Sequence, residues 1–241
     1  MTTPRSDTAP SLPEAHERLG HIVVRLPALL PVLHRHQLDY CCGGNIPLAE
    51  ACTKQGLDLE ALLAEFEVSL AGSAAPTEVW ADRPLAELTR HIVARFHEAH
   101  RAQLPVLLEM AEKVERVHAD KPSALHGLAE FLAGWIPELA QHMEKEEAVL
   151  FPMIERGHGK QAGPPIQTME REHADHGENL QRLRGIAHDF VPPAEACTTW
   201  RALYAGLESF EREIMEHVHL ENHVLFPMAL KGAPAQAPEE V

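Results

Sequence analysis

HMEKEEAVLFP at residues 142–152 and HVHLENHVLFP at residues 217–227 share the pattern H-x3-E-x3-L-F-P, at an offset of 75 residues. A second matched pair, His97-x2-His100 and His173-x2-His176, recurs at an offset of 76. Two helical hairpins are therefore predicted to repeat and to pack about a pseudo-twofold axis. A repeat of this kind predicts a symmetric site for two metal ions.

The histidine and the glutamate of each segment are four residues apart, as in His142 with Glu146 and His217 with Glu221. This spacing places both side chains on one helix face, about 6 Å apart along the axis. Imidazole with carboxylate suits iron, manganese or zinc, and two carboxylates that bridge two metals hold them about 3.5–4 Å apart. We expect two non-haem iron ions with an oxo or hydroxo bridge. A single zinc ion is the alternative, although the doubled motif offers more ligands than one ion uses.

Four long segments each carry an apolar stripe with alternating steps of three and four residues, which is typical of helices that bury one face in a bundle. Histidines or glutamates interrupt every stripe. A buried polar group without a partner costs about 1–3 kcal/mol, and an ionised carboxylate costs more, so these groups need a shared reason such as a metal. The stripes consist of Val93, His97, His100, Leu104, Leu107, Ala111, Val114 and His118; Leu125, Leu128, Leu132, Trp135, Leu139, His142, Glu146 and Val149; Ile166, Met169, His173, His176, Leu180, Leu183, Ala187 and Phe190; and Trp200, Leu203, Leu207, Phe210, Ile214, His217, Glu221 and Val224.

The charge balance limits the classes of partner. With 36 acidic and 21 basic side chains, the net charge of -15 repels phosphate backbones and anionic lipids, so we expect no nucleic acid and no membrane partner. The N-terminus lacks the apolar core of a signal peptide, and no stretch approaches the roughly 18 apolar residues that span a bilayer. The adjacent Cys41 and Cys42 favour reduced thiols over a disulfide framework. We expect a cytoplasmic protein.

Composition, with only 5% aromatic residues, and the helical stripes predict an all-α chain, and proline and glycine positions divide it into two domains. Pro27, Pro31, Gly44 and Gly56 divide its first part into three or four short helices. We predict a disordered tail at residues 1–12, a small helical domain with the cysteine pair at 13–71, a linker at 72–84, a four-helix bundle at 85–231 with breaks at 119–123, 156–165 and 191–194, and a tail at 232–241.

Three further strings accompany the repeated motif: LDYCCGG at 38–44, VERVHADKPS at 114–123 and PPAEACTTW at 192–200. Together they resemble the hemerythrin-like di-iron proteins called repair of iron centres, over about residues 16–231. The resemblance implies a hemerythrin-like bundle behind a cysteine-bearing N-terminal domain, and a role in repairing iron–sulfur clusters damaged by oxidative and nitrosative stress. Iron donation and nitric oxide chemistry both stay open as the means.

The resemblance also implies the ligands. The resemblance implies that His97 rather than His100, and His173 rather than His176, are ligands. Periodicity cannot distinguish the two members of each pair, because they share a stripe. His100, His118 and His176 become candidates for an outer shell around the ligands. The implied iron ligands are His97, His142, Glu146, His173, His217 and Glu221.

The expected partners are damaged iron–sulfur proteins and small ligands such as nitric oxide or dioxygen, with a homodimer as a further candidate. Cys41 and Cys42 are candidates for thiol chemistry with iron or a nitrosyl group, and capping of a helix before Gly43 and Gly44 is the structural alternative. A hemerythrin-like protein that binds or senses oxygen or nitric oxide would need only the bundle. A ferritin-like oxidase or iron store is expected to use Glu-x-x-His spacing, which these helices do not show.

Overall fold

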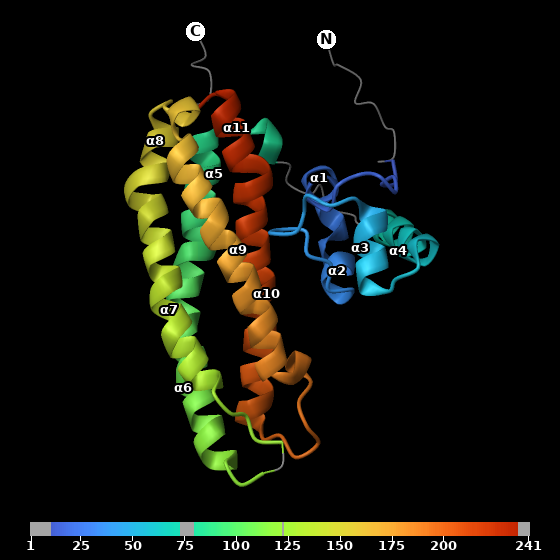
Figure 1. The fold of residues 1–241 in the computed structure, drawn as a ribbon, viewed down its shortest axis with the longest axis vertical. Helices are drawn as coiled ribbons and strands as arrows, with labels where there is room; N and C mark the ends of the chain where they lie inside the picture. The colour runs from blue at the N-terminus through green and yellow to red at the C-terminus, as the bar shows by residue number, and fades with distance from the viewer. Residues whose placement is uncertain (1–10, 73–79, 122, 236–241) are drawn as a thin grey trace. The chain divides into compact units, whose positions relative to one another are not determined.

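The structure, a computed structural model, describes residues 11–72, 80–121 and 123–235, and its regular elements in these ranges are helices. The predicted all-α class is confirmed. The chain divides into two compact units, residues 1–81 and residues 82–241 (Figure 1). Of the expected tails and linker, residues 1–10, 73–79 and 236–241 lie outside the described residues.

The first unit is a small cluster of short helices. Pro31 does not break a helix as expected, because it is the second residue of α2, where the N–H that a proline lacks is not needed. Gly56 ends α3 in the left-handed conformation, with φ of 66°. The helices are α1 (Leu19–Arg25), α2 (Leu30–Arg35), α3 (Leu48–Gln55) and α4 (Leu59–Gly72), with a 3₁₀ turn at Pro27–Leu29.

The second unit contains four helical rods that run side by side (Figure 1). One rod joins α5 to α6, one joins α7 to α8, α9 is the third, and one joins α10 to α11. Short 3₁₀ turns lie at Trp80–Asp82, Gly159–Gln161 and His188–Phe190. The helices are α5 (Leu85–Ile92), α6 (Glu98–His118), α7 (Leu128–Lys145), α8 (Phe151–Glu155), α9 (Gly163–Ile186), α10 (Thr198–Leu220) and α11 (Phe226–Lys231).

The three joined rods each contain one π-helical turn, at Val93–His97, Glu146–Leu150 and Glu221–Leu225. A π turn holds one residue more than an α turn, so it shifts the register of everything that follows. Val149 was expected on the buried stripe but is 51% exposed, while Leu150 is 1% exposed. The strict heptad interpretation was therefore wrong beyond Glu146.

Two other boundaries differ from the sequence prediction. Leu125, expected on the second stripe, is buried but precedes α7, which begins at Leu128. Pro164 and Pro165 were expected in a break, yet they lie in the first turn of α9. Proline is well tolerated there because the first N–H groups of a helix have no intrahelical acceptor.

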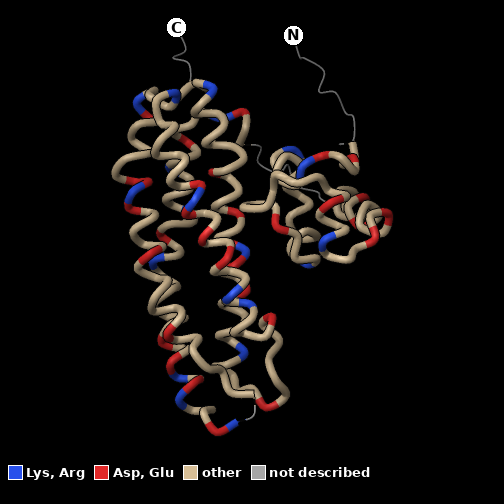
Figure 2. Tube along the Cα trace, viewed as in Figure 1, with Lys and Arg blue, Asp and Glu red and all other residues tan. Residues whose placement is uncertain are grey.

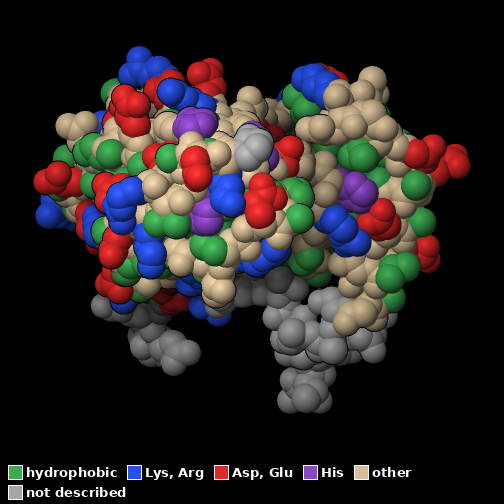
Figure 3. All heavy atoms as spheres, turned by 90° about the horizontal axis from the view of Figure 1, so that it is seen from below, with side chains coloured by type: hydrophobic (Ala, Val, Ile, Leu, Met, Phe, Trp, Pro, Cys, Tyr) green, Lys and Arg blue, Asp and Glu red, His purple; other side chains and the backbone are tan. Residues whose placement is uncertain are grey.

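The stripes of the rods meet in an apolar core, in which Trp200, Leu203, Leu207 and Phe210 are fully buried. Acidic and basic residues are both scattered along the rods (Figure 2). On the face seen in Figure 3, charges of both signs lie among hydrophobic side chains. Within the described residues, no helix combines the length and the apolar character that crossing a membrane requires.

A methyl group added at either of two glycines of the bundle should change its stability, with opposite signs at the two positions. A Cβ atom on Gly159 would lie 2.7 Å from the carbonyl oxygen of Ala229, whereas one on Gly134, within α7, would meet nothing within 4 Å. Gly159→Ala should therefore destabilise the bundle by about 1–3 kcal/mol, and Gly134→Ala should stabilise it by about 0.5–1 kcal/mol. Thermal unfolding followed by circular dichroism measures both. Changes of the same sign would contradict this packing.

Candidate metal centre

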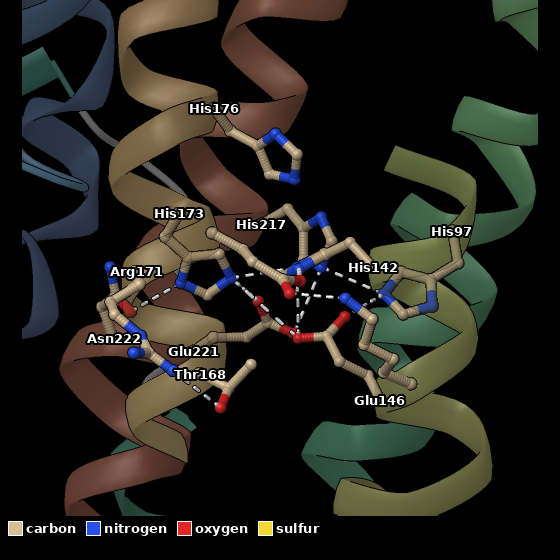
Figure 4. A network of polar contacts seen from close by, with 12 residues as sticks. His97, His142, Glu146, Thr168, Arg171, His173, His176, His217, Glu221 and Asn222 are labelled. Atoms are coloured by element: carbon tan, nitrogen blue, oxygen red, sulfur yellow. Dashed lines mark hydrogen bonds and ion pairs between the residues drawn. The ribbon is translucent and has the colours of Figure 1, made fainter. Parts of the chain in front are cut away.

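Six polar side chains converge in the interior of the bundle, beside the three π turns (Figure 4). They come from all four rods, and each is at most 1% exposed. The structure thus brings together the six residues that the resemblance implied as iron ligands, namely His97, His142, Glu146, His173, His217 and Glu221.

The first half of the cluster is built by His97 and His217, whose Nε2 atoms lie 3.0 Å apart. Nε2 of His97 is 3.4 Å from Oε2 of Glu146. Nε2 of His217 is 3.2 Å from Oε1 of Glu221. The donor atoms of these four residues all lie within 4.8 Å of one another, close enough to surround one ion.

The second half is built by His142 and His173, whose Nε2 atoms lie 3.1 Å apart. Here Nε2 of His142 is 3.4 Å from Oε1 of Glu146, and Nε2 of His173 is 3.1 Å from Oε2 of Glu221. Each glutamate therefore turns one oxygen to each half. This is the arrangement of two carboxylates that bridge two metal ions.

The buried carboxylates fit a metal pair. Neither oxygen of Glu146 has a hydrogen-bond partner among the described residues, although the side chain is fully buried. Burial and then the neighbouring Glu221 raise the pKa of Glu146 well above its usual range. Burial also acts to raise the pKa of Glu221, but His217 and His173 beside it hold that pKa well below its usual range. Two cations would compensate both carboxylates at once.

Two acidic residues outside the cluster orient the histidine rings. Nδ1 of His97 lies 2.6 Å from Oε1 of Glu147, and Nδ1 of His142 lies 2.9 Å from Oε2 of Glu172. Because a carboxylate can only accept, Nδ1 carries the proton in both rings. The lone pair is then on Nε2, which points into the cluster and is free to bind a metal.

Asn222 has the same role for His173, with its Oδ1 2.7 Å from Nδ1. These orienting residues were not predicted. Asn222 and Glu147 each directly follow a glutamate of the cluster and are 75 residues apart, so the repeat itself contained the signal. The helix periodicity did not indicate these residues, because they lie at the edge of the buried stripe.

His217 differs from the other three histidines of the cluster. Its Nδ1 has no hydrogen-bond partner among the described residues. The ring of Phe96 stacks on it instead, with 5.5 Å between ring centroids and 7° between ring planes. Phe96 is the repeat counterpart of Glu172, since both directly precede a histidine of the matched pair. The two halves are therefore related but not equivalent.

Two of the three expected outer-shell histidines border the cluster. The ring of His176 lies 4.9 Å from that of His142, and the ring of His100 lies 5.6 Å from that of His217, between centroids. The structure does not bring His118 to the cluster. It ends α6, about 30 Å along the axis from the cluster, where its Nε2 is 3.3 Å from Sγ of Cys197.

Comparison with known proteins agrees with this geometry. The family model described as the hemerythrin HHE cation binding domain matches residues 88–229, which include all six converging side chains. The chain belongs to the hemerythrin HHE family. A second model, described as a domain of unknown function, DUF542, matches residues 15–69.

Curated relatives of this hemerythrin HHE protein cover both units. The iron-sulfur cluster repair protein YtfE of Yersinia pseudotuberculosis is 46% identical over 217 residues, which are 90% of this chain and 98% of that protein. The proteins of the same name from Dickeya chrysanthemi and Pectobacterium carotovorum are each 46% identical over 216 residues, which are 90% of this chain and 97% of theirs.

The thiol pair lies in the region matched by the DUF542 model. Oδ1 of Asp39 accepts the backbone N–H groups of Cys41 and Cys42 at 3.1 and 3.0 Å and lies 3.2 Å from Sγ of Cys41. The two sulfur atoms are 3.6 Å apart. The hydrogen bond with Cys42, followed by burial, raises the pKa of Cys41 well above its usual range. Cys41 is buried, with 2% of its surface exposed. Cys42 is half-buried.

The buried histidines of the hemerythrin domain predict that the metal-free protein is acid-labile. Burial and neighbouring histidines lower the pKa of His97 to about 4, of His100 to about 2 and of His176 to about 3. As pH falls from about 6.5 toward 4, the unfolded chain binds protons that the folded chain does not, so the free energy of unfolding falls. Glu146, whose pKa is raised, has the opposite effect on the free energy of unfolding, but it is one group whereas the histidines are three.

Urea unfolding of the metal-free protein at pH 7 and pH 5 measures this effect. The free energy of unfolding should be lower at pH 5 by roughly a few kcal/mol. His100→Leu should flatten the dependence, and His158→Ala, at an exposed position, should not change it. A free energy of unfolding that stays level or rises toward pH 5 would refute the neutral state of these rings.

Proposed function

We propose that this protein repairs iron–sulfur clusters damaged by oxidative and nitrosative stress, in the reducing cytoplasm, with a di-iron centre in its bundle. The observation that carries the proposal is the pair of buried glutamates, each with one oxygen toward each pair of histidines. The names of the relatives support the repair function. Damaged iron–sulfur proteins are the proposed partners.

In this proposal His97 and His217 would hold one iron, His142 and His173 would hold the other, and Glu146 and Glu221 would serve both. When bound, the irons would supply redox chemistry and sites for a small ligand such as nitric oxide or dioxygen, and in iron donation they are themselves the cargo. Two nitrogens and two carboxylate oxygens would hold each ion, and iron accepts further ligands, so a small ligand could bind or exchange there.

The surroundings of Glu172 provide a connection to solvent. Its Oε2 contacts Nδ1 of His142, its Oε1 contacts Nζ of Lys145, and its side chain is about one-quarter exposed. It lines a pocket of about 420 Å³ between α7 and α9. A change in the contacts of Glu172 at the surface would therefore alter the hydrogen bond that orients the His142 ring, which suits a site that must release iron.

The second candidate is a hemerythrin-like protein that binds or senses oxygen or nitric oxide. The bundle alone would suffice for that function. The grouping of Asp39, Cys41 and Cys42 in the first unit, close enough to hold a metal ion, favours repair, because it gives iron a second set of ligands in the same chain.

Loss of either bridging carboxylate should abolish the centre. Glu146→Ala or Glu221→Ala should reduce the iron content from about two per chain to near zero, since each glutamate serves both ions. Glu144→Ala, at an exposed position of α7, and His158→Ala are matched controls that should keep their iron. Metal analysis after anaerobic loading measures the content. Equal iron in Glu146→Ala and the unaltered protein would rule out the bridge.

The cysteine pair should matter for repair but not for the centre. Cys41→Ser with Cys42→Ser should leave the iron content and optical spectrum unchanged and should slow the restoration of a nitric-oxide-damaged cluster protein several-fold. Cys52→Ala is the matched control, because Cys52 is equally buried in the same unit. Repair at the unaltered rate by the double variant would assign the activity to the bundle alone and favour the second candidate.

A further inference from the structure

His100 and His176 are buried histidines beside the metal centre that the proposed ligand set leaves out. Each follows a proposed ligand by three residues, and they are 0% and 4% exposed. The Nε2 atom of each has no hydrogen-bond partner among the described residues. Two orphaned nitrogens at matching places of the repeat call for a common explanation.

The protonation of His176 follows from its one hydrogen bond. Nε1 of Trp135 lies 3.1 Å from Nδ1 of His176. An indole N–H can only donate, so Nδ1 must accept and carries no proton. The ring is therefore neutral, and its hydrogen is on Nε2.

The protonation of His100 follows in the same way from Gln103. The amide nitrogen of Gln103 donates to Oε2 of Glu213 at 2.9 Å, which fixes the orientation of the amide. The same nitrogen lies 3.3 Å from Nδ1 of His100, which must accept. His100 also carries its hydrogen on Nε2.

This tautomer is the opposite of that found in the oriented ligands. His97 and His142 have their hydrogen on Nδ1 and turn a lone pair to the cluster. His100 and His176 offer an N–H instead, which cannot bind a metal but can bind an acceptor. A buried donor left without an acceptor costs about 1–3 kcal/mol, so the pair is suited to an occupant that bears lone pairs.

The rings are close to the positions where such an occupant would bind. Figure 4 shows the ring of His176 extending from α9 over the cluster, with one nitrogen turned toward it. His176 borders the half with His142, and His100 borders the half with His217. His176 also lines the pocket of about 420 Å³ between α7 and α9, which gives a small molecule a path from solvent.

We propose that His176 and His100 are positioning residues whose Nε2–H groups bind a small anionic or oxygen-containing ligand at the metal centre, one in each half. The inference rests on the proposed di-iron centre. It assigns the ligand-binding side of the second half to His176, where the pocket reaches it, and it gives Trp135 a role in ligand binding without contact to the ligand.

Azide is the probe for ligand binding, titrated optically into the oxidised iron protein. His176→Phe keeps an aromatic ring but loses the N–H, so azide should bind roughly tenfold more weakly at unchanged iron content. Trp135→Phe keeps His176 but removes the hydrogen bond that fixes its tautomer, so it should weaken azide binding by a smaller factor. The double variant should bind azide no more weakly than His176→Phe, because Trp135 acts through His176. Trp200→Phe, at another fully buried tryptophan of the bundle, should leave azide affinity unchanged.

Nitrogen-15 correlation spectra of the metal-free protein test the tautomers without any iron. His176 and His100 should show a protonated Nε2, and Trp135→Phe should shift His176 toward a mixture. A protonated Nδ1 in the unaltered protein would overturn the inference. So would unchanged azide affinity in His176→Phe with two irons bound, which would leave the di-iron centre intact. An unaltered protein that takes up no iron would instead overturn the proposed function and this inference with it.

Discussion

The centre of this bundle depends on the burial of two carboxylates, Glu146 and Glu221, which are both fully shielded from solvent. An ionised carboxylate in an apolar interior is unfavourable unless cations or hydrogen bonds compensate it, and Glu146 has no hydrogen-bond partner among the described residues. The histidines and the backbone around the two glutamates are arranged to compensate the buried charge. Four Nε2 atoms converge on the carboxylate oxygens, and the two turns that begin at these glutamates are π-helical. Such turns occur frequently at functional sites.

The repeat produces a symmetric centre with asymmetric surroundings. Glu147 and Asn222 orient their histidines from corresponding positions, whereas Phe96 faces His217 at the place where Glu172 serves His142. The pocket between α7 and α9 is lined by Glu172 and His176, and both of these side chains contact His142 of the second half. In the proposed di-iron centre, two similar sets of side chains with different surroundings would allow the two ions to differ in exchange and in ligand binding.

The resemblance to the repair of iron centres family selected the six side chains that converge. From its helix periodicity, the sequence predicted the fold class and the burial of histidines and glutamates on facing stripes. It did not predict the exposure of Val149, since a π turn depends on tertiary packing and leaves no mark in a heptad pattern. It did not show that Cys41 is buried beside Asp39, whose Oδ1 accepts the backbone N–H groups of Cys41 and Cys42. Periodicity could not choose between His97 and His100 because both lie on one stripe, and in the structure Nδ1 of His97 contacts Glu147 whereas Nδ1 of His100 contacts Gln103.

The most direct test of the central claim is Mössbauer spectroscopy of the iron-57 protein together with metal analysis of the same sample. The oxidised protein should contain about two irons per chain and show the diamagnetic spectrum of a coupled ferric pair. The iron environment should stay unchanged when Cys41 and Cys42 are both replaced by serine. One tightly bound zinc with no iron, after expression in iron-replete medium, would contradict the di-iron centre, because a single ion cannot use both faces of the two buried glutamates.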